Sequence, residues 1–151
     1  MRAIRPHEKF SLLIVHADEE LRSRFESAAA ATDRFWSIRC MADGRFALEH
    51  MWACVENGDA DVPDIIITDL LVEGLNGVQL TRELRRFEEL REIFVALIVS
   101  SGGALEQDAA ESAGCDYYLR QPETASDLAD VLHAIANRCA LKASVPERLV
   151  G

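Results

Sequence analysis

The segment Asp64-Ile65-Ile66-Ile67-Thr68-Asp69 joins a run of mostly β-branched residues to an aspartate at its carboxyl end. β-Branched side chains favour strands, and an apolar run without alternation is typical of a strand covered on both faces. Similar apolar runs recur along the chain, at Ser11–Val15, Phe35–Met41, Phe94–Ser100 and Tyr117–Leu119. The sequence therefore predicts a sheet of five buried strands, with 64–68 as the third and Asp69 at its end.

Helical patterns lie between these strands. They are Glu19–Ala31, Gly44–Asn57, a segment that starts after the N-cap Asn76, Ala104–Ala113, and a last segment with apolar residues at 128, 131, 132, 135 and 139. Strict alternation of strands and helices predicts an α/β fold, a doubly wound five-stranded parallel sheet with helices on both faces. At this size the usual strand order is the flavodoxin-like 2-1-3-4-5, which puts a binding site at the carboxyl ends of the first and third strands.

Length and charge limit the domain organisation and the partners. The 151 residues suit one domain, for which we expect an N-terminal extension 1–9, a folded unit 10–141 and a flexible tail 142–151. A net charge of −10 argues against binding nucleic acid. No apolar run reaches the roughly 18 residues of a membrane span and no secretion signal is evident, so we expect a cytoplasmic protein without membrane contact. The four cysteines are widely spaced, which predicts reduced thiols rather than a metal cluster.

Polar residues follow the strands at the edge where a site is expected. His16-Ala17-Asp18-Glu19 follows the first strand, Asp69 ends the third, Ser100-Ser101 ends the fourth and Gln121-Pro122 follows the fifth. An aspartate after a strand is often only a turn former or helix cap. Its position at the topological switch point, opposite Ser100, favours a functional role for Asp69.

Four segments resemble the receiver domain of bacterial response regulators. They are Leu13–Arg22, Pro63–Gly77, Val99–Ser101 and Ala113–Pro122, and the similarity extends from Phe10 to Cys139. The resemblance implies a signalling module rather than an enzyme, in which Asp69 accepts a phosphoryl group from a sensor histidine kinase or a phosphotransfer protein. It also implies output to a downstream protein through the face of the fourth helix, fifth strand and fifth helix, with Ser100 and Tyr118 as the switch residues.

The chain departs from the family pattern around Asp69. Receivers usually hold Mg²⁺ with two acids after the first strand, the phosphoacceptor, and a backbone carbonyl two residues further on, and a lysine follows the fifth strand. Here the acid positions hold His16 and Ala17, and the lysine position holds Gln121. Only the Asp69 side chain and the Leu71 carbonyl remain as oxygen ligands, so we expect Mg²⁺ binding to be weak or absent.

Several alternatives stay open on the sequence alone. Asp18 or Glu19 could substitute for a missing acid, or both could be first-turn residues of the first helix. His16 could be an imidazolium that partly replaces the metal ion, or a neutral surface histidine. The whole chain could be a pseudo-receiver that binds proteins independently of phosphorylation. A phosphatase would want a second acid where Leu71 stands, and a flavin binder would want a phosphate loop in place of the glycine-free segment 16–20.

Overall fold

The computed structural model describes residues 9–58, 62–100 and 104–144. Most of the expected N-terminal extension, residues 145–151 of the expected tail, and Ser101 lie outside these described residues. Among the described residues, none of the helices combines the length and hydropathy that crossing a bilayer requires.

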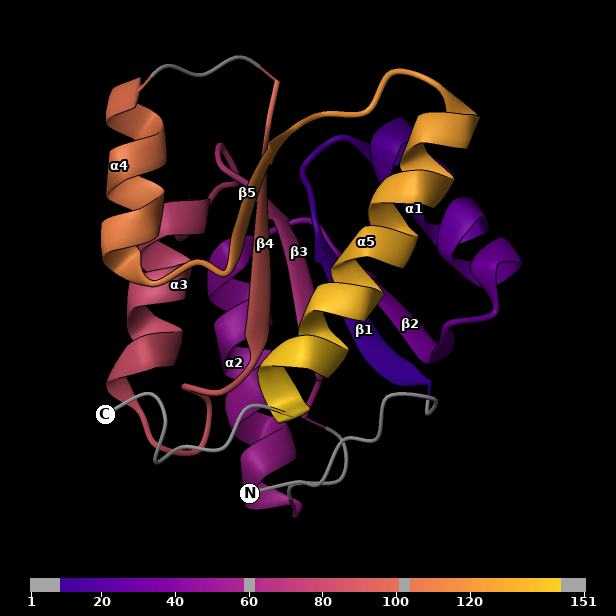
Figure 1. The fold of residues 1–151 in the computed structure, drawn as a ribbon. Helices are drawn as coiled ribbons and strands as arrows, with labels where there is room; N and C mark the ends of the chain where they lie inside the picture. Colours follow the sequence, from indigo (N-terminus) through magenta and orange to yellow (C-terminus); the bar gives the residue numbers. More distant parts are fainter. Residues whose placement is uncertain (1–8, 59–61, 101–103, 145–151) are drawn as a thin grey trace.

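A parallel sheet forms the centre of the molecule (Figure 1). The strands lie in the order β2-β1-β3-β4-β5, which confirms the order predicted from the sequence. They are β1 (Phe10–Val15), β2 (Phe35–Met41), β3 (Ile65–Asp69), β4 (Phe94–Val99) and β5 (Tyr117–Arg120). β3 therefore lies at the centre, between β1 and β4, and its last residue is Asp69.

Five helices cover the two faces of this sheet. Helices α1 and α5 pack on one face and α2, α3 and α4 on the other (Figure 1). Their bounds are α1 (Glu19–Thr32), α2 (Gly44–Glu56), α3 (Gly77–Arg86), α4 (Ala104–Ala113) and α5 (Ala125–Ser144). Residues 142–144, expected in the flexible tail, are helical instead. In this last turn of α5, Lys142 Nζ lies 2.9 Å from a carboxylate oxygen of Asp116, which ties the end of the helix to the segment before β5.

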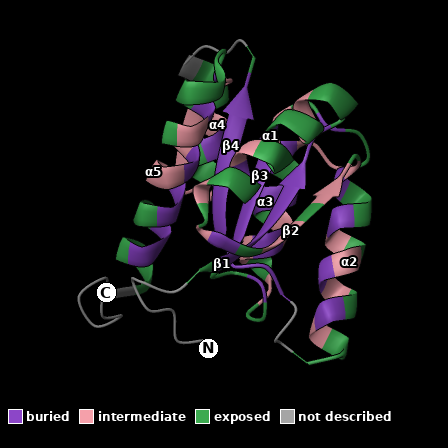
Figure 2. Ribbon diagram, turned by 90° about the vertical axis from the view of Figure 1, so that its right-hand side faces the viewer, coloured by how far each residue is buried: buried purple, intermediate pink, exposed green. Residues whose placement is uncertain are grey.

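The core lies on both sides of the central strands (Figure 2). Leu12 and Ile14 of β1 pack toward α1 and α5, whereas Leu13 and Val15 pack toward α2 and α3. This is the alternation of side chains that a strand imposes, and both directions are apolar because both faces are covered. The uninterrupted apolar runs of the sequence have this cause.

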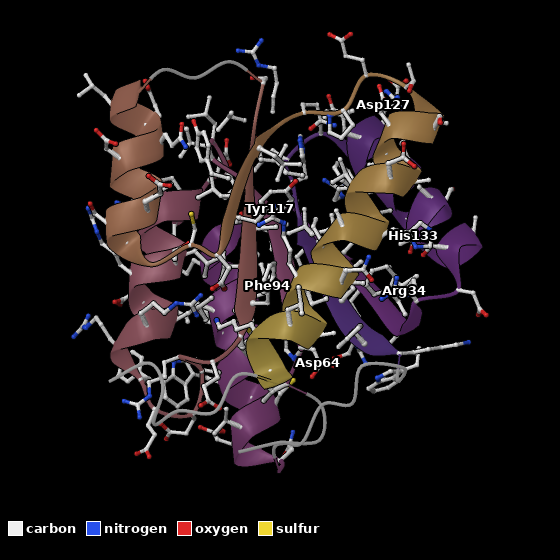
Figure 3. The ribbon with its side chains drawn as sticks, viewed as in Figure 1. Arg34, Asp64, Phe94, Tyr117, Asp127 and His133 are labelled. Carbon is white, nitrogen blue, oxygen red and sulfur yellow. The ribbon has the colours of Figure 1, made fainter. Side chains whose placement is uncertain are left out.

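Buried polar contacts stabilise the amino end of the sheet, away from Asp69. Asp64 accepts hydrogen bonds from the backbone N–H and the hydroxyl of Ser11, at 2.9 and 3.2 Å. In Figure 3, Asp64 lies at the opposite end of the sheet from Asp127, which is in the first turn of α5. On the α1–α5 side, an Arg34 guanidinium nitrogen lies 3.4 Å from His133 Nδ1, and these two residues lie together in Figure 3. Neither the Asp64–Ser11 contact nor the Arg34–His133 contact reaches the carboxyl edge.

Candidate functional site

The carboxyl end of β3 brings Asp69 beside the residue that follows β1. Val15 and Thr68 are partners in the parallel register, so the next residues along the two strands, His16 and Asp69, are neighbours. His16 Nε2 lies 3.9 Å from Asp69 Oδ2, and the two side chains are 9% and 17% exposed. The imidazole and the carboxylate therefore converge, as the sequence predicted, in a site that solvent still reaches.

Close packing of α3 supports the backbone behind Asp69. The Gly77 N–H donates to the Leu70 carbonyl at 2.9 Å. A Cβ atom at Gly77 would lie 2.9 Å from the Asp69 carbonyl oxygen, closer than such atoms pack. Sequence reasoning gave Gly77 no role of its own, although a glycine directly after the N-cap Asn76 was a signal of close approach.

His16 is held by the start of α1. Its ring is buried, so the alternative of a surface histidine is wrong. Its Nδ1 accepts a hydrogen bond from the Asp18 backbone N–H at 3.1 Å. The other ring nitrogen, Nε2, is the one that faces Asp69. The backbone of the β1–α1 loop thus sets the orientation of the imidazole.

The two acids that follow His16 and Ala17 are part of the helix start. Asp18 is the N-cap of α1, and its side chain accepts from the Leu21 N–H at 3.1 Å. Glu19 is exposed in the first turn, where its negative charge interacts favourably with the positive end of the helix dipole. Of the two alternatives for these acids, the structure therefore agrees with the one in which they belong to the first turn of α1.

Arg22, which the sequence did not single out, contacts the backbone at positions 16 and 17, where receivers usually have acids. Arg22 Nη1 donates to the carbonyl of His16 at 2.7 Å and to the carbonyl of Ala17 at 3.1 Å. Arg22 is one turn into α1, so its side chain reaches back over the loop. The available signal was an arginine four residues after the helix N-cap, but nothing in the sequence said which carbonyls it would contact.

Ser100 and Gln121 belong to the next two strand ends. Asp69 is paired with Ile98, and Ser100 lies two residues further, on the same face by strand alternation. The Gln121 N–H donates to Val99 O at 2.7 Å, which fixes its backbone beside that end of β4. Its side-chain amide contacts the carbonyl of the next residue at 3.5 Å. Within the described ranges, neither side chain forms a hydrogen bond with Asp69.

Tyr118 points to the other face of the sheet. Its ring packs with the cluster formed by Val78, Leu97, Val99, Ala110 and Ala113, between α3 and α4. Its hydroxyl is buried and has no hydrogen-bond partner among the described residues. Burial raises the pKa of this hydroxyl, and the charge of Glu106 raises it further. Tyr118 therefore connects β5 to α4 by packing, with a polar atom left unsatisfied.

The β3–α3 loop, which carries Leu71, is attached to the start of α2. Asp43 caps α2 by accepting from the N–H of Arg45 at 2.7 Å, and Gly44 N donates to the Glu73 carbonyl at 2.8 Å. A Cβ atom at Gly44 could not be accommodated against the Leu75 carbonyl. This contact holds the loop that follows Asp69 close to the carboxyl edge.

The donor set around Asp69 does not fit Mg²⁺. This ion requires near-octahedral coordination by oxygen atoms. The residues at hand are one carboxylate, one imidazole and the backbone of Leu71, since the acid positions hold His16 and Ala17. Over the parts of the chain that the structure describes, no group of three or more histidine, cysteine or acidic side chains could hold a metal ion.

Comparisons with known proteins identify the family to which the chain belongs. A family model described as the response regulator receiver domain matches residues 12–133. The chain is 26% identical over 125 residues to the transcriptional regulatory protein TcrA of Mycobacterium tuberculosis, covering 83% of this chain and 46% of that relative. It is 34% identical over 70 residues to the response regulator protein VraR of Staphylococcus epidermidis, covering 46% of this chain and 32% of the relative. The chain thus spans 46% or less of the length of these two relatives.

Solved structures of response regulators have the same fold. A two-component response regulator from Cytophaga hutchinsonii is 25% identical with a TM-score of 0.71, covering 86% of this chain and 99% of that one. The phosphorylated cyanobacterial phytochrome response regulator RcpA is 18% identical with a TM-score of 0.77, covering 92% of this chain and 99% of that one. At 18% identity this second likeness concerns the fold alone. Because the family model covers most of the chain, this protein belongs to the response regulator receiver domains, the receiver modules of two-component signalling.

Proposed function

We propose that Asp69 is the phosphoacceptor of this receiver domain. The observation that supports the proposal is the position of its carboxylate at the end of the central strand β3, 17% exposed and facing the residue after β1. A phosphoryl donor can reach a carboxylate at this edge of the sheet. The strands β1 and β4, which pair with β3 on either side, hold its backbone in place. The donor is a sensor histidine kinase or a phosphotransfer protein.

Weak Mg²⁺ binding and slow phosphotransfer are expected of this site. A phosphoryl group and a carboxylate are both negative, so transfer is favoured by a nearby cation. His16 and Ala17 stand where acids would bind a metal ion, and Gln121 stands where a lysine would pair with the phosphate. The domain therefore retains the nucleophile and lacks most of the charge that assists it.

Output through protein contacts is supported by Tyr118. Its ring packs against α4 and its hydroxyl is buried without a partner among the described residues. A buried hydroxyl without a partner costs free energy, so an alternative position of this ring competes with the observed one. A change at Ser100 could shift that balance and alter the α4–β5–α5 face, where a downstream protein binds. The net charge of −10 favours a protein target over nucleic acid.

Intact-mass measurement tests the phosphoacceptor. The protein is incubated with acetyl phosphate, or with a phosphorylated histidine-kinase donor, in the presence of Mg²⁺. We expect the wild type to gain the mass of one phosphoryl group slowly and Asp69→Asn to gain none. Asp64→Asn is the matched control, because Asp64 is an aspartate at the other end of the sheet, bound to Ser11.

Two outcomes would contradict the proposal. Equal gain by the wild type and Asp69→Asn would place the phosphoryl group elsewhere. No gain with any donor, while both variants remain folded, would favour a pseudo-receiver that binds its partners independently of phosphorylation.

A further inference from the structure

The imidazole of His16 has its proton placed by the backbone. Nδ1 accepts a hydrogen bond from the Asp18 N–H at 3.1 Å, so Nδ1 carries a lone pair and no proton. In a neutral imidazole the proton then resides on Nε2, the nitrogen that faces Asp69. An imidazolium would carry a proton on both nitrogens and would lose the bond from Asp18.

Distance alone would allow a metal ion between the two side chains. His16 Nε2 and Asp69 Oδ2 are 3.9 Å apart. Zinc, for example, binds nitrogen and oxygen ligands at about 2.0–2.2 Å each, so a small shift would fit one ion between these atoms. A ligating histidine, however, offers a lone pair to the metal and donates from its other nitrogen. His16 has the reverse arrangement.

We propose that His16 closes the Asp69 site to divalent cations by presenting an N–H, rather than a lone pair, to the carboxylate. The inference rests on Asp69 being the functional site proposed above. It goes further than the loss of the acid pair, because it excludes the metals that accept imidazole as well as Mg²⁺. His16 is thus a positioning residue that donates toward Asp69, and a shift of about 1 Å would bring the pair to hydrogen-bond length.

Arg22 acts in the same direction. Its guanidinium donates to the carbonyls of His16 and Ala17, the two positions that carry acids in related receivers. The family's metal-binding loop therefore already holds a fixed positive charge in this protein. A second cation placed beside it would be repelled.

The tautomer of His16 is the first test, and it is read from the wild-type protein. A long-range ¹H–¹⁵N spectrum of the protein labelled in its histidine rings distinguishes the two neutral tautomers. The signals of His16 are identified by their loss in His16→Asn, and the His133 ring serves as an internal comparison. We expect the Nε2–H form. The Nδ1–H form, or exchange between the two forms, would overturn the proposal.

Metal binding to a partly restored site is the second test. Ala17→Asp returns one acid to the loop, and His16→Ala combined with Ala17→Asp also removes the ring. Mn²⁺ is titrated into both, and binding is read from the broadening of amide signals around Asp69. Changes around a metal site alter affinity by about 10-fold to 100-fold, and we expect the double variant to bind that much more tightly.

The comparison of the two variants isolates the His16 ring, because the alanine in the double variant offers no metal ligand in its place. Equal affinity, or tighter binding while His16 is present, would show that the ring does not exclude metal and would overturn the proposal. A thermal melt confirms that each variant is folded, and the tautomer measurement decides if one is not. Neither readout requires phosphoryl transfer, so a failure of Asp69 to accept phosphate is distinguishable from a failure of this inference.

Discussion

Replacing Arg85 with alanine should destabilise the fold strongly, because this side chain links three segments of the chain. Arg85 lies in α3, and its guanidinium donates to the carbonyls of Gly114, Arg91 and Ile93 at 2.8–3.0 Å. It also pairs with the Asp116 carboxylate at 2.9 Å. Arg85→Ala therefore removes four hydrogen bonds and leaves Asp116 with one charged partner instead of two.

The size of the effect follows from burial. Breaking a buried ion pair by removing one partner costs about 3–5 kcal/mol. The side chains of Arg85 and Asp116 are both 19% exposed, and burial lowers the pKa of the guanidinium. Because Lys142 stays beside Asp116, we take the lower end of the range, about 3 kcal/mol of unfolding free energy. For a domain of this size that corresponds to a decrease in Tm of about 6–12 °C.

Urea denaturation followed by circular dichroism measures this difference. Arg86→Ala is the matched control, since Arg86 is the next residue, 66% exposed, paired across one helical turn with Glu83 and placed over the neighbouring Phe87 ring. We expect the control to lose less than about 1 kcal/mol. Arg85→Lys should still lose most of the stability, because an ammonium cannot contact all four acceptors at once. A midpoint for Arg85→Ala within error of that for Arg86→Ala would refute the reasoning.

Three further predictions concern the carboxyl edge and its switch. Gly77→Ala should destabilise the protein by about 1–3 kcal/mol and shift the amide signals around Asp69, since the added methyl group meets the Asp69 carbonyl; an unchanged urea midpoint would contradict this. Asp18→Ala should cost about 1 kcal/mol through loss of the helix cap and leave the Mg²⁺ titration unchanged, whereas an altered titration would identify its carboxylate as a ligand. Tyr118→Phe should remove a tyrosinate transition, seen by ultraviolet absorbance, that lies above pH 10. Because the pKa is raised in the folded state, ionisation of this hydroxyl leaves the free energy of unfolding unchanged below pH 10 and lowers it as the pH rises further. A transition at or below pH 10 would be the opposite result.

The sequence alone determined the architecture and the identity of the central carboxylate. Uninterrupted apolar runs such as 65–67 require cover on both faces, and their alternation with helical periods leaves few topologies for a parallel sheet. The strand order, the start of α3 after Asn76 and the extent of α4 followed from these local patterns. The placement of Asp69 beside His16 followed as well, because the carboxyl ends of neighbouring parallel strands share one edge.

Only the tertiary structure decided what the neighbouring side chains do. The ring of His16 is oriented by a backbone N–H two residues away, and the Arg22 side chain donates to the His16 carbonyl rather than extending into solvent. Arg85 contacts Gly114 and Asp116, which lie 29 and 31 residues further along the chain, and Asp116 also pairs with Lys142 of α5. Such choices depend on distances of a few ångströms between elements, which periodicity and composition do not encode. Local sequence patterns therefore predict the fold, whereas the chemistry of the Asp69 site depends on how the helices and strands pack together.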